Sequence, residues 1–235
     1  MKFKEYLNES INDKGILKSC FMAGFPASGK SYVIKQIKSG SIGTKVVNTD
    51  TWVEFYGKGA NVNWTEYGDK VKLLAKEQLM LYLNSLLPLW IDGTSSNSHA
   101  VFRRKGILES IGYDTGMVWV QAKLETILER NRSRKRVVDE DFIIDTYNKL
   151  EKYKNYYKTQ FKPFLIIDND DGVLTDDIIL KAYKGMSSFF NSPIKNFIGQ
   201  ELKEEMISSG HKYLFDTDKY DKQYLNKLID SWYVK

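Results

Sequence analysis

Short, nearly continuous apolar segments alternate along the chain with longer segments in which apolar residues recur at helical spacing. The short segments are typical of buried strands, and they lie at 16–21, 45–50, 89–91, 117–120 and 164–167. Strands that alternate with helices in this way favour a parallel sheet with helices on both faces. The pattern therefore predicts an α/β fold with a five-stranded parallel sheet sandwiched by helices.

The segments between and after the strands carry the helical pattern. Helices are predicted over 30–38, 65 to about 86, 101–110, 124–132 and 140 to about 157. Asp139 is a candidate N-cap for the last of these. After Gly172 no segment resembles a strand, and helices are predicted over 177–190 and 198–206. We therefore divide the chain into three parts. They are an N-terminal segment 1–14, a domain 15–171 and a helical C-terminal extension 172–235.

Composition limits the class of protein. The 235 residues are 42% hydrophobic and 14% aromatic, which is enough for a sizeable core and excludes a disordered chain. No apolar run approaches the ~18 residues of a membrane span. We expect no membrane association, and the start of the chain lacks the apolar core of a signal peptide. With Cys20 as the only cysteine and two histidines, an internal disulfide and the usual zinc sites are excluded. A cytoplasmic location is expected.

The pattern G-x-x-x-x-G-K-S is complete between Gly24 and Ser31, after a predicted strand and before a predicted helix. In this setting glycines let the backbone wrap a phosphate, and the N–H groups of the loop and helix start attract negative charge. Lys30 would reach the outer phosphates, and Ser31 would bind magnesium. The predicted nucleotide-binding residues are Gly24, Ala27, Ser28, Gly29, Lys30, Ser31 and Tyr32.

Two aspartates follow neighbouring strands, where ligands of parallel sheets gather. Asp50 ends the second predicted strand, and its carboxylate could take a proton from an acceptor hydroxyl that faces the γ-phosphate. Asp92 follows the third strand and could hold magnesium or orient Asp50 and Ser31. Each alone could be an ordinary polar strand end; together with the loop they favour phosphoryl transfer.

The distribution of arginine is uneven. All six arginines lie at 103, 104, 130, 132, 134 and 136, although the net charge of +5 is modest. The guanidinium group suits phosphate oxygens, so Arg130 and Arg134 are predicted to stabilise the transferred phosphoryl group from a lid at about 124–140. They share a helical face if the helix continues through Ser133. Arg132 and Arg136 could instead be solvated residues at the helix end.

Four motifs occur in the order and approximate spacing of a known family over residues 16–170. They are Gly24-Phe25-Pro26-Ala27-Ser28-Gly29-Lys30-Ser31, Asn48-Thr49-Asp50, Ile91-Asp92-Gly93-Thr94, and Arg130-Asn131-Arg132-Ser133-Arg134 followed by Val137-Val138-Asp139-Glu140. The chain resembles the phage-type polynucleotide 5′-hydroxyl kinase domain and its zeta-toxin-like relatives.

The resemblance implies a P-loop kinase fold with a helical lid, which uses ATP and Mg²⁺. By the same resemblance Lys30 and Ser31 bind phosphates and magnesium, Asp50 is the general base, and Asp92 supports the metal or the base. Arg130 and Arg134 would belong to the lid. A nucleic acid or another nucleotide-type molecule is the expected acceptor.

One position departs from the family. Polynucleotide kinases commonly have an arginine three residues after the base, where it holds the acceptor's phosphate, whereas this chain has Val53. The nearby Trp52, Phe55 and Tyr56 could stack on a base or sugar, or could belong to the core. Kinases of modified DNA bases and kinases of nucleotide sugars or small molecules therefore stay open. So does a non-catalytic phage interaction protein that uses nucleotide binding as a switch.

Two further segments have alternative interpretations. Residues 166–174 resemble the D-x-D-G-T phosphatase signature, but an extra residue and Val173 break the pattern, so we expect a strand followed by an acidic turn. Residues 1–9, ending in Leu7-Asn8-Glu9, resemble a capsid-targeting leader of tailed phages. Such a leader would imply packaging in a virion; the alternative is a short terminal helix that docks on the core.

Overall fold

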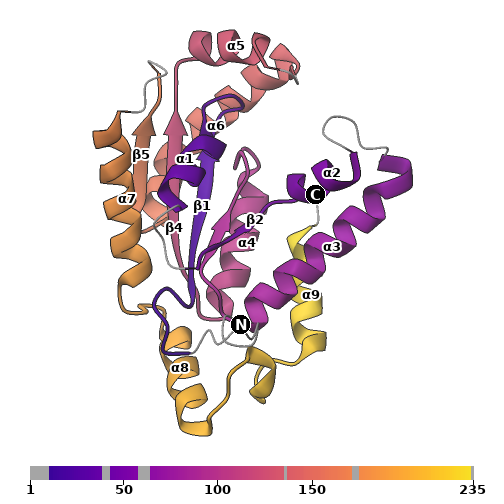
Figure 1. Cartoon of the computed structure of the whole chain (residues 1–235), viewed down its shortest axis with the longest axis vertical. Helices are drawn as coiled ribbons and strands as arrows, with labels where there is room; N and C mark the ends of the chain where they lie inside the picture. Colours follow the sequence, from indigo (N-terminus) through magenta and orange to yellow (C-terminus); the bar gives the residue numbers. More distant parts are fainter. Residues whose placement is uncertain (1–10, 39–42, 58–63, 135–136, 171–174, 234–235) are drawn as a thin grey trace, which may run out of the picture.

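The computed structural model describes residues 11–38, 43–57, 64–134, 137–170 and 175–233. Five strands form one parallel sheet in the order β2-β3-β1-β4-β5 (Figure 1). Their bounds are β1 Lys18–Gly24, β2 Lys45–Val47, β3 Leu89–Ile91, β4 Asp114–Gln121 and β5 Phe164–Asp168. The predicted α/β fold with five parallel strands is confirmed.

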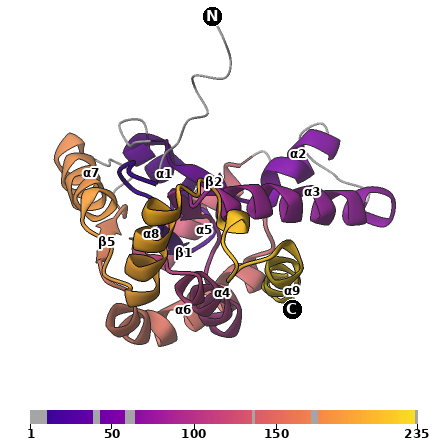
Figure 2. The same ribbon diagram turned by 90° about the horizontal axis from the view of Figure 1, so that it is seen from below.

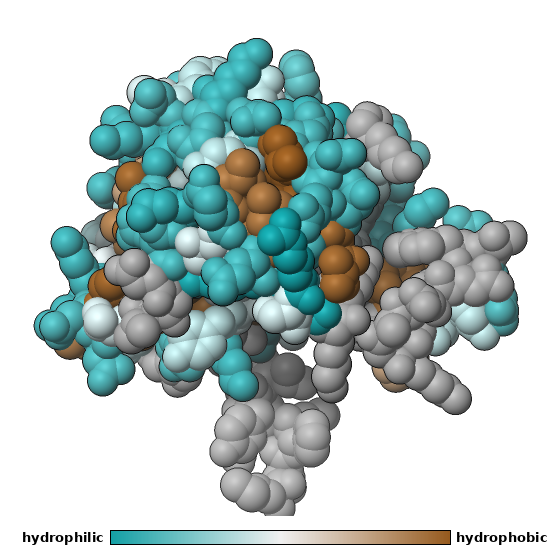
Figure 3. All heavy atoms as spheres, turned by 90° about the horizontal axis from the view of Figure 1, so that it is seen from above, coloured by the Kyte–Doolittle hydropathy of each residue, from teal (hydrophilic) through white to brown (hydrophobic). Residues whose placement is uncertain are grey.

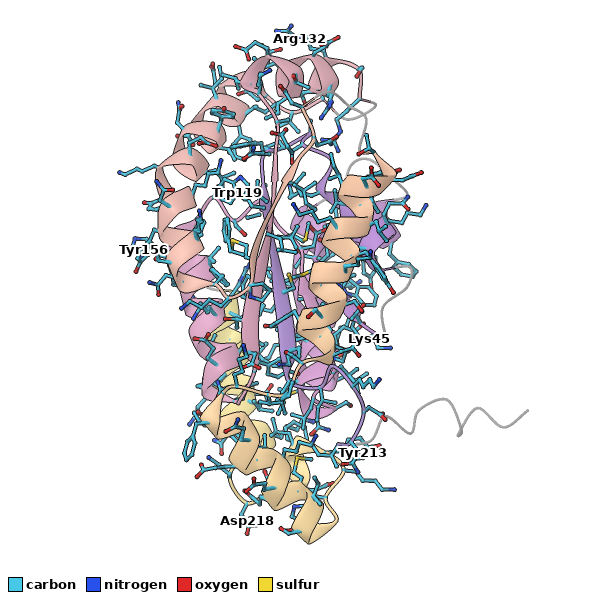
Figure 4. The ribbon with its side chains drawn as sticks, turned by 90° about the vertical axis from the view of Figure 1, so that its left-hand side faces the viewer. Lys45, Trp119, Arg132, Tyr156, Tyr213 and Asp218 are labelled. Atoms are coloured by element: carbon cyan, nitrogen blue, oxygen red, sulfur yellow. The ribbon has the colours of Figure 1, made fainter. Side chains whose placement is uncertain are left out.

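Side chains of the central strands alternate between two apolar cores, one on each face of the sheet. On one face Cys20 and Val118 pack in a core with α1 (Lys30–Lys38) and α7 (Asp176–Asn191). On the other face Phe21 and Trp119 pack in a core with α4 (Ser98–Ser110) and α6 (Glu140–Gln160). Figure 4 shows Trp119 pointing from the sheet toward α6, whereas Tyr156 points outward from that helix. The sheet is therefore sandwiched, as the near-continuous apolar strands predict.

The remaining helices lie around this sandwich. They are α2 Asp50–Gly57, α3 Trp64–Asn84, α5 Leu124–Arg132, α8 Phe197–Ser209, the 3₁₀ helix η2 Leu214–Asp216 and α9 Lys222–Trp232. In Figure 1, α5 lies at the end of the molecule toward which the strands run, and α8 lies at the opposite end. Among the described helices, none combines the length and apolar character needed to cross a lipid bilayer.

The described part of the predicted extension, residues 175–233, packs on the rest of the chain. Helix α7 lies beside α1 and β5, and α9 contacts α3 and α4 (Figure 2). An ion pair of 2.7 Å between Lys76 Nζ and Asp230 Oδ1 links α3 with α9. Helix α9 buries Leu225, Ile229 and Trp232, which lie along one face at spacings of four and three residues. The last helix therefore forms part of the wall that flanks the sheet.

A buried ion pair fixes the base of the sheet. The Nζ atom of Lys18 lies 2.5 Å from Asp114 Oδ2 and also donates to Ser192 Oγ (3.1 Å) and to the carbonyl of Pro193 (2.9 Å). The backbone N–H of Asn196 donates to the other carboxylate oxygen of Asp114. These bonds attach the connection between α7 and α8 to the starts of β1 and β4.

Three local predictions need correction. The strand predicted over 45–50 ends at Val47, because the carbonyl of Thr49 accepts the N–H groups of Trp52 and Val53 and so starts α2 at Asp50. Helix α5 ends at Arg132, so Arg134 does not continue the helical face of Arg130. Helices α2 and α9 were not predicted as separate elements.

Other local predictions are confirmed or lie outside the described residues. The predicted N-cap is confirmed, since Asp139 Oδ1 accepts the N–H of Phe142 at 3.0 Å. Helix α5 has the predicted bounds. The proposed leader at residues 1–9 lies outside the described part of the chain.

Candidate active site

The loop after β1 has the backbone geometry of a phosphate cradle. Gly24 has φ +146°, and a Cβ there would collide with the carbonyl oxygen of Val120. Ala27 (φ +60°) and Gly29 (φ +92°) also lie in the left-handed region, which turns the chain sharply before α1 starts at Lys30. The loop therefore places the N-terminus of α1 at the carboxyl ends of the strands, where a phosphate group could bind to it.

The turn after β5 supports this loop from one side. Asn169 Nδ2 donates a 2.7 Å hydrogen bond to the carbonyl of Ser28. A Cβ on Gly29 would collide with the same Nδ2 atom, so the second glycine of the motif permits this close approach. Sequence reasoning missed Asn169, because the motif alone does not reveal which distant residue braces it.

Lys30 is held by the loop itself. Its Nζ donates to the carbonyl oxygens of Gly24 (2.9 Å) and Phe25 (2.7 Å). Burial lowers the pKa of Lys30 to about 8, the nearby Asp92 carboxylate opposes this shift, and Arg134 adds to it. These backbone bonds keep the ammonium beside the cradle, from which it could exchange carbonyls for phosphate oxygens.

A cavity of about 780 Å³ lies at the carboxyl ends of the strands. The predicted residues that line it are Ala27, Gly29, Lys30, Ser31, Tyr32, Asp92, Arg130 and Arg134. Gly24 and Ser28 are buried in the loop beneath it. Thr49 lines the cavity directly before Asp50, whose side chain lies outside the described part of the structure. Figure 3 looks onto this end of the molecule, which is mainly hydrophilic with a small apolar group near its centre.

The side chain of Asp92 is oriented by Asn48, which follows β2. Its Oδ2 atom accepts a 2.8 Å hydrogen bond from Asn48 Nδ2, and its backbone N–H donates to the carbonyl of Val47. Ser31 is exposed and lines the same cavity. Mg²⁺ is usually held by one or two protein oxygens together with substrate phosphates, so a hydroxyl and one carboxylate fit that ion. Among the described residues no group of three or more His, Cys, Asp or Glu gathers as a metal cluster.

The two arginines predicted for a lid, Arg130 and Arg134, differ in how they are held. Arg130 Nη2 donates to the carbonyl of Asp170 (3.1 Å), whereas its buried Nη1 has no hydrogen-bond partner among the described residues. Arg134 is exposed, yet it lines the same cavity. Both therefore face the cavity, although they do so from the end of α5 and the bend after it rather than from one helical face.

Arg132 has a surface position. It pairs with Glu140 at 2.7 Å and lies at the tip of the molecule in Figure 4. This geometry agrees with the alternative of a solvated helix end. Arg136 lies outside the described residues.

The acidic segment after β5 has a structural role. Asp170 Oδ1 accepts hydrogen bonds from the backbone N–H of Lys123 (2.9 Å) and from Thr126 Oγ1 (2.7 Å). The Lys123 ammonium, which bonds Asp170 Oδ2, and then these two bonds lower the pKa of Asp170 to about 2. The carboxylate is thus occupied in fixing the start of α5, which agrees with an acidic turn rather than a phosphatase signature.

The aromatic residues of α2 form a partly exposed cluster. Trp52 and Phe55 have ring centroids 6.3 Å apart, Phe55 and Tyr56 5.3 Å, and Tyr56 stacks on Tyr67 of α3 at 5.2 Å. Phe55 is 71% exposed. The interpretation of this cluster as core is therefore wrong for Phe55, which is available to contact other molecules.

Sequence reasoning also missed two residues of the cavity. Arg104 of α4 and Tyr233, which follows α9, line it together with the P-loop. Because the chain has only six arginines, the presence of Arg104 could have indicated a binding role. Nothing local marks Tyr233, because it reaches the cavity only through the packing of α9 on α3 and α4.

Several solved structures have a similar chain path. A chain of the Pnkp1/Rnl/Hen1 RNA repair complex is 18% identical with a TM-score of 0.49, and the match covers 64% of this chain and 48% of that one. A gluconokinase from Sinorhizobium meliloti 1021 is 14% identical with a TM-score of 0.44, covering 83% and 99%. A shikimate kinase from Bacteroides thetaiotaomicron is 16% identical with a TM-score of 0.42, covering 72% and 96%.

The chain spans about half the length of the RNA repair chain that it matches. A comparison with curated protein sequences gave no significant match. A family model described as an AAA domain, AAA_33, matches residues 20–157, which include the P-loop, Asp92 and α5. Because this match covers more than half of the chain, the protein belongs to the AAA_33 family of AAA domains.

Proposed function

We propose that this protein is a P-loop kinase that transfers the γ-phosphate of ATP to a hydroxyl group of a nucleic acid or nucleotide-type acceptor. The observation that carries the proposal is the shared cavity of about 780 Å³. It brings Lys30 and Ser31 of the cradle together with Asp92 and with Arg130 and Arg134. Arginines in addition to the lysine of the cradle are suited to stabilising the negative charge of a transferred phosphoryl group.

On the nucleotide side, the cradle and the N-terminus of α1 would bind the β- and γ-phosphates. Lys30 would leave the carbonyls of Gly24 and Phe25 for the phosphate oxygens. Ser31 and Asp92 would hold Mg²⁺, which neutralises charge on the phosphates when bound. Asn48 keeps the Asp92 carboxylate oriented for this contact.

On the acceptor side, Asp50 would act as the general base. The acceptor oxygen forms a bond to the γ-phosphorus while the bond from that phosphorus to the bridging oxygen of ADP breaks, and the hydroxyl proton passes to the Asp50 carboxylate. Arg130 and Arg134 stabilise the negative charge on the equatorial oxygens. The buried Nη1 of Arg130, which has no partner among the described residues, is a donor suited to that task.

Transfer of labelled γ-phosphate to a panel of acceptors tests the proposal. The panel contains 5′-hydroxyl DNA and RNA, duplex DNA with hydroxymethylated pyrimidines, free nucleosides and UDP-sugars. We expect labelling of one acceptor class and a loss of at least about 100-fold in turnover with Asp50→Asn, because general-base catalysis contributes about 10²–10⁴. Affinity for ADP should stay at the wild-type value in this variant.

Asp145→Asn is the matched control, because Asp145 pairs with Lys149 on the exposed face of α6. It should leave transfer unchanged. Wild-type turnover in Asp50→Asn would refute the role of that residue. Nucleotide binding without transfer to any acceptor would refute the kinase and favour the nucleotide-dependent switch. If UDP-sugars alone were labelled, the acceptor would be a nucleotide sugar and not a nucleic acid.

A further inference from the structure

Two residues of the cavity wall are not used by the transfer chemistry described above. They are Arg104 on α4 and Tyr233 after α9. Helix α9 is held in place by the ion pair between Lys76 and Asp230 and by its packing on α3 and α4 (Figure 1). The C-terminal segment therefore forms one wall of the same cavity as the P-loop.

Arg104 is fixed but lacks a carboxylate partner. Its Nε donates to the carbonyl of Trp232 at 3.2 Å, and the guanidinium carbon lies 5.4 Å from the centroid of the Trp232 ring. Within the described part of the chain, no Asp or Glu forms an ion pair with it. Burial lowers the pKa of Arg104, and the positive charge of Arg103 adds to this shift, while Tyr233 opposes it. A desolvated guanidinium of this kind attracts an anion strongly.

Tyr233 adds a second donor at the same place. Its hydroxyl oxygen is buried and has no hydrogen-bond partner among the described residues. Burial raises the pKa of Tyr233 to about 12, and Arg104 opposes the shift, so the hydroxyl keeps its proton at neutral pH. A buried hydroxyl without a partner is unfavourable, and it gains most from an acceptor oxygen. Arg104 and Tyr233 together offer donors to a ligand rich in oxygen and negative charge.

We propose that Arg104 and Tyr233 bind a phosphate group of the acceptor, at a distance from the hydroxyl that is phosphorylated. This inference rests on the proposed kinase function. The nucleotide's phosphates have their own cations in Lys30, Arg130 and Arg134, whereas Val53 supplies no charge on the acceptor side. Polar residues of the loop between β3 and α4, among them Ser96 and Asn97, line the same cavity as Arg104. The C-terminal helix thus contributes to acceptor specificity.

The test compares thymidine 3′-phosphate with thymidine, which differ only in the phosphate. The full-length protein is saturated with AMP-PNP and Mg²⁺, and each probe is titrated by calorimetry. We expect wild-type protein to bind the phosphorylated probe at least about tenfold more tightly, because hydrogen bonds to a charged group are strong. Arg104→Gln should remove this preference, and Tyr233→Phe should reduce it about two- to fivefold. Neither variant should change the affinity for thymidine.

Arg132→Gln is the matched control, because Arg132 lies outside the cavity and pairs with Glu140. Its preference for the phosphorylated probe should equal that of the wild type. Two conservative variants are less prone to misfold: Tyr233→Phe keeps the aromatic ring, and Arg104→Lys keeps the positive charge. A wild-type Tm is the criterion for a folded variant.

Equal binding of the two probes by wild-type protein would overturn the inference. So would an unchanged preference in both Arg104→Gln and Tyr233→Phe. Weaker AMP-PNP binding in folded Arg104→Gln would assign the anion to the nucleotide and would also overturn it. These results are distinct from a failure of the proposed function. That failure would appear as absent phosphoryl transfer, whereas this test measures binding alone.

Discussion

The protonation of Lys30 links the geometry of the P-loop to a measurable pH dependence. With its Nζ held by two backbone carbonyls and partly buried, Lys30 has a pKa of about 8 in the unliganded protein. Phosphate oxygens would replace these carbonyls and stabilise the charged form. Above pH 8 the binding of ADP must therefore take up a proton.

The size of this effect follows from the pKa. The affinity for ADP falls by the factor 1 + 10^(pH − pKa), so it is about elevenfold weaker at pH 9 than at low pH, a difference of about 1.4 kcal/mol. Proton uptake on binding should rise from about 0.1 at pH 7 to about 0.9 at pH 9. A phosphate has its second pKa near about 6, so the charge of ADP is nearly constant over this range.

Calorimetric titration with ADP at pH 7, 8 and 9, in two buffers of different ionisation enthalpy, measures both quantities. Lys30→Arg is the control that keeps a permanent positive charge, and it should show no proton uptake. Proton uptake near zero at pH 9 in the wild type would refute the reasoning, because Lys30 would then have an ordinary pKa.

The lowered pKa of Lys30 also determines the direction in which the free energy of unfolding changes with pH. Because the pKa of Lys30 in the folded protein lies below its unfolded value of 10.5, the unfolded chain binds more protons between pH 8 and 10.5. The contribution of this residue to the free energy of unfolding therefore rises with pH in that window. Bound ADP should abolish the rise, since it restores the charge in the folded state.

Two other substitutions test the framework of the site. Gly29→Ala should weaken ADP binding at least about tenfold and lower the Tm, because it forces a left-handed φ of +92° on alanine and collides with Asn169 Nδ2. Gly106→Ala, whose added Cβ meets nothing within 4 Å in α4, should leave binding unchanged; equal behaviour of the two variants would contradict the role of Gly29. Asp114→Ala should lower the free energy of unfolding by about 3–5 kcal/mol in urea, because it leaves the Lys18 ammonium buried without its carboxylate. The double variant Lys18→Met/Asp114→Leu should recover part of that loss, and a loss equal to or larger than that of the single variant would argue against this cause.

The fold was predictable where local pattern and tertiary packing agree. Strands β1 and β4 carry apolar side chains on both faces, so their short continuous runs of apolar residues indicate a parallel sheet. Helix α5 was found with its correct bounds. The strand at 45–50 was extended too far, because the cap formed by the Thr49 carbonyl is a backbone feature that composition does not show. Helix α9 was missed because its three buried residues are spread among charged neighbours.

The site was predictable to the extent that it is contiguous in sequence. The P-loop is a single run of eight residues, whereas Asn169 lies 141 residues after Ser28, to which it is bonded. Arg104 lies in α4 and Tyr233 follows α9, and these two helices meet only in the folded chain. Arg134 was predicted from the affinity of guanidinium for phosphate; it lines the cavity from the bend after α5, although α5 does not continue through Ser133 to give it the helical face of Arg130. Tertiary placement, rather than residue type, was the missing information.

One turn positions both the phosphate cradle and the lid. Asn169 donates to the carbonyl of Ser28 in the P-loop, and the adjacent Asp170 accepts from Lys123 and Thr126 at the start of α5. The carbonyl of Asp170 also accepts from Arg130 at the end of the same helix. The distance between cradle and lid is therefore set by two consecutive residues at the end of β5. Because all of β5 pairs with β4, this turn holds the P-loop and α5 at a defined place relative to each other, which the proposed phosphoryl transfer would require.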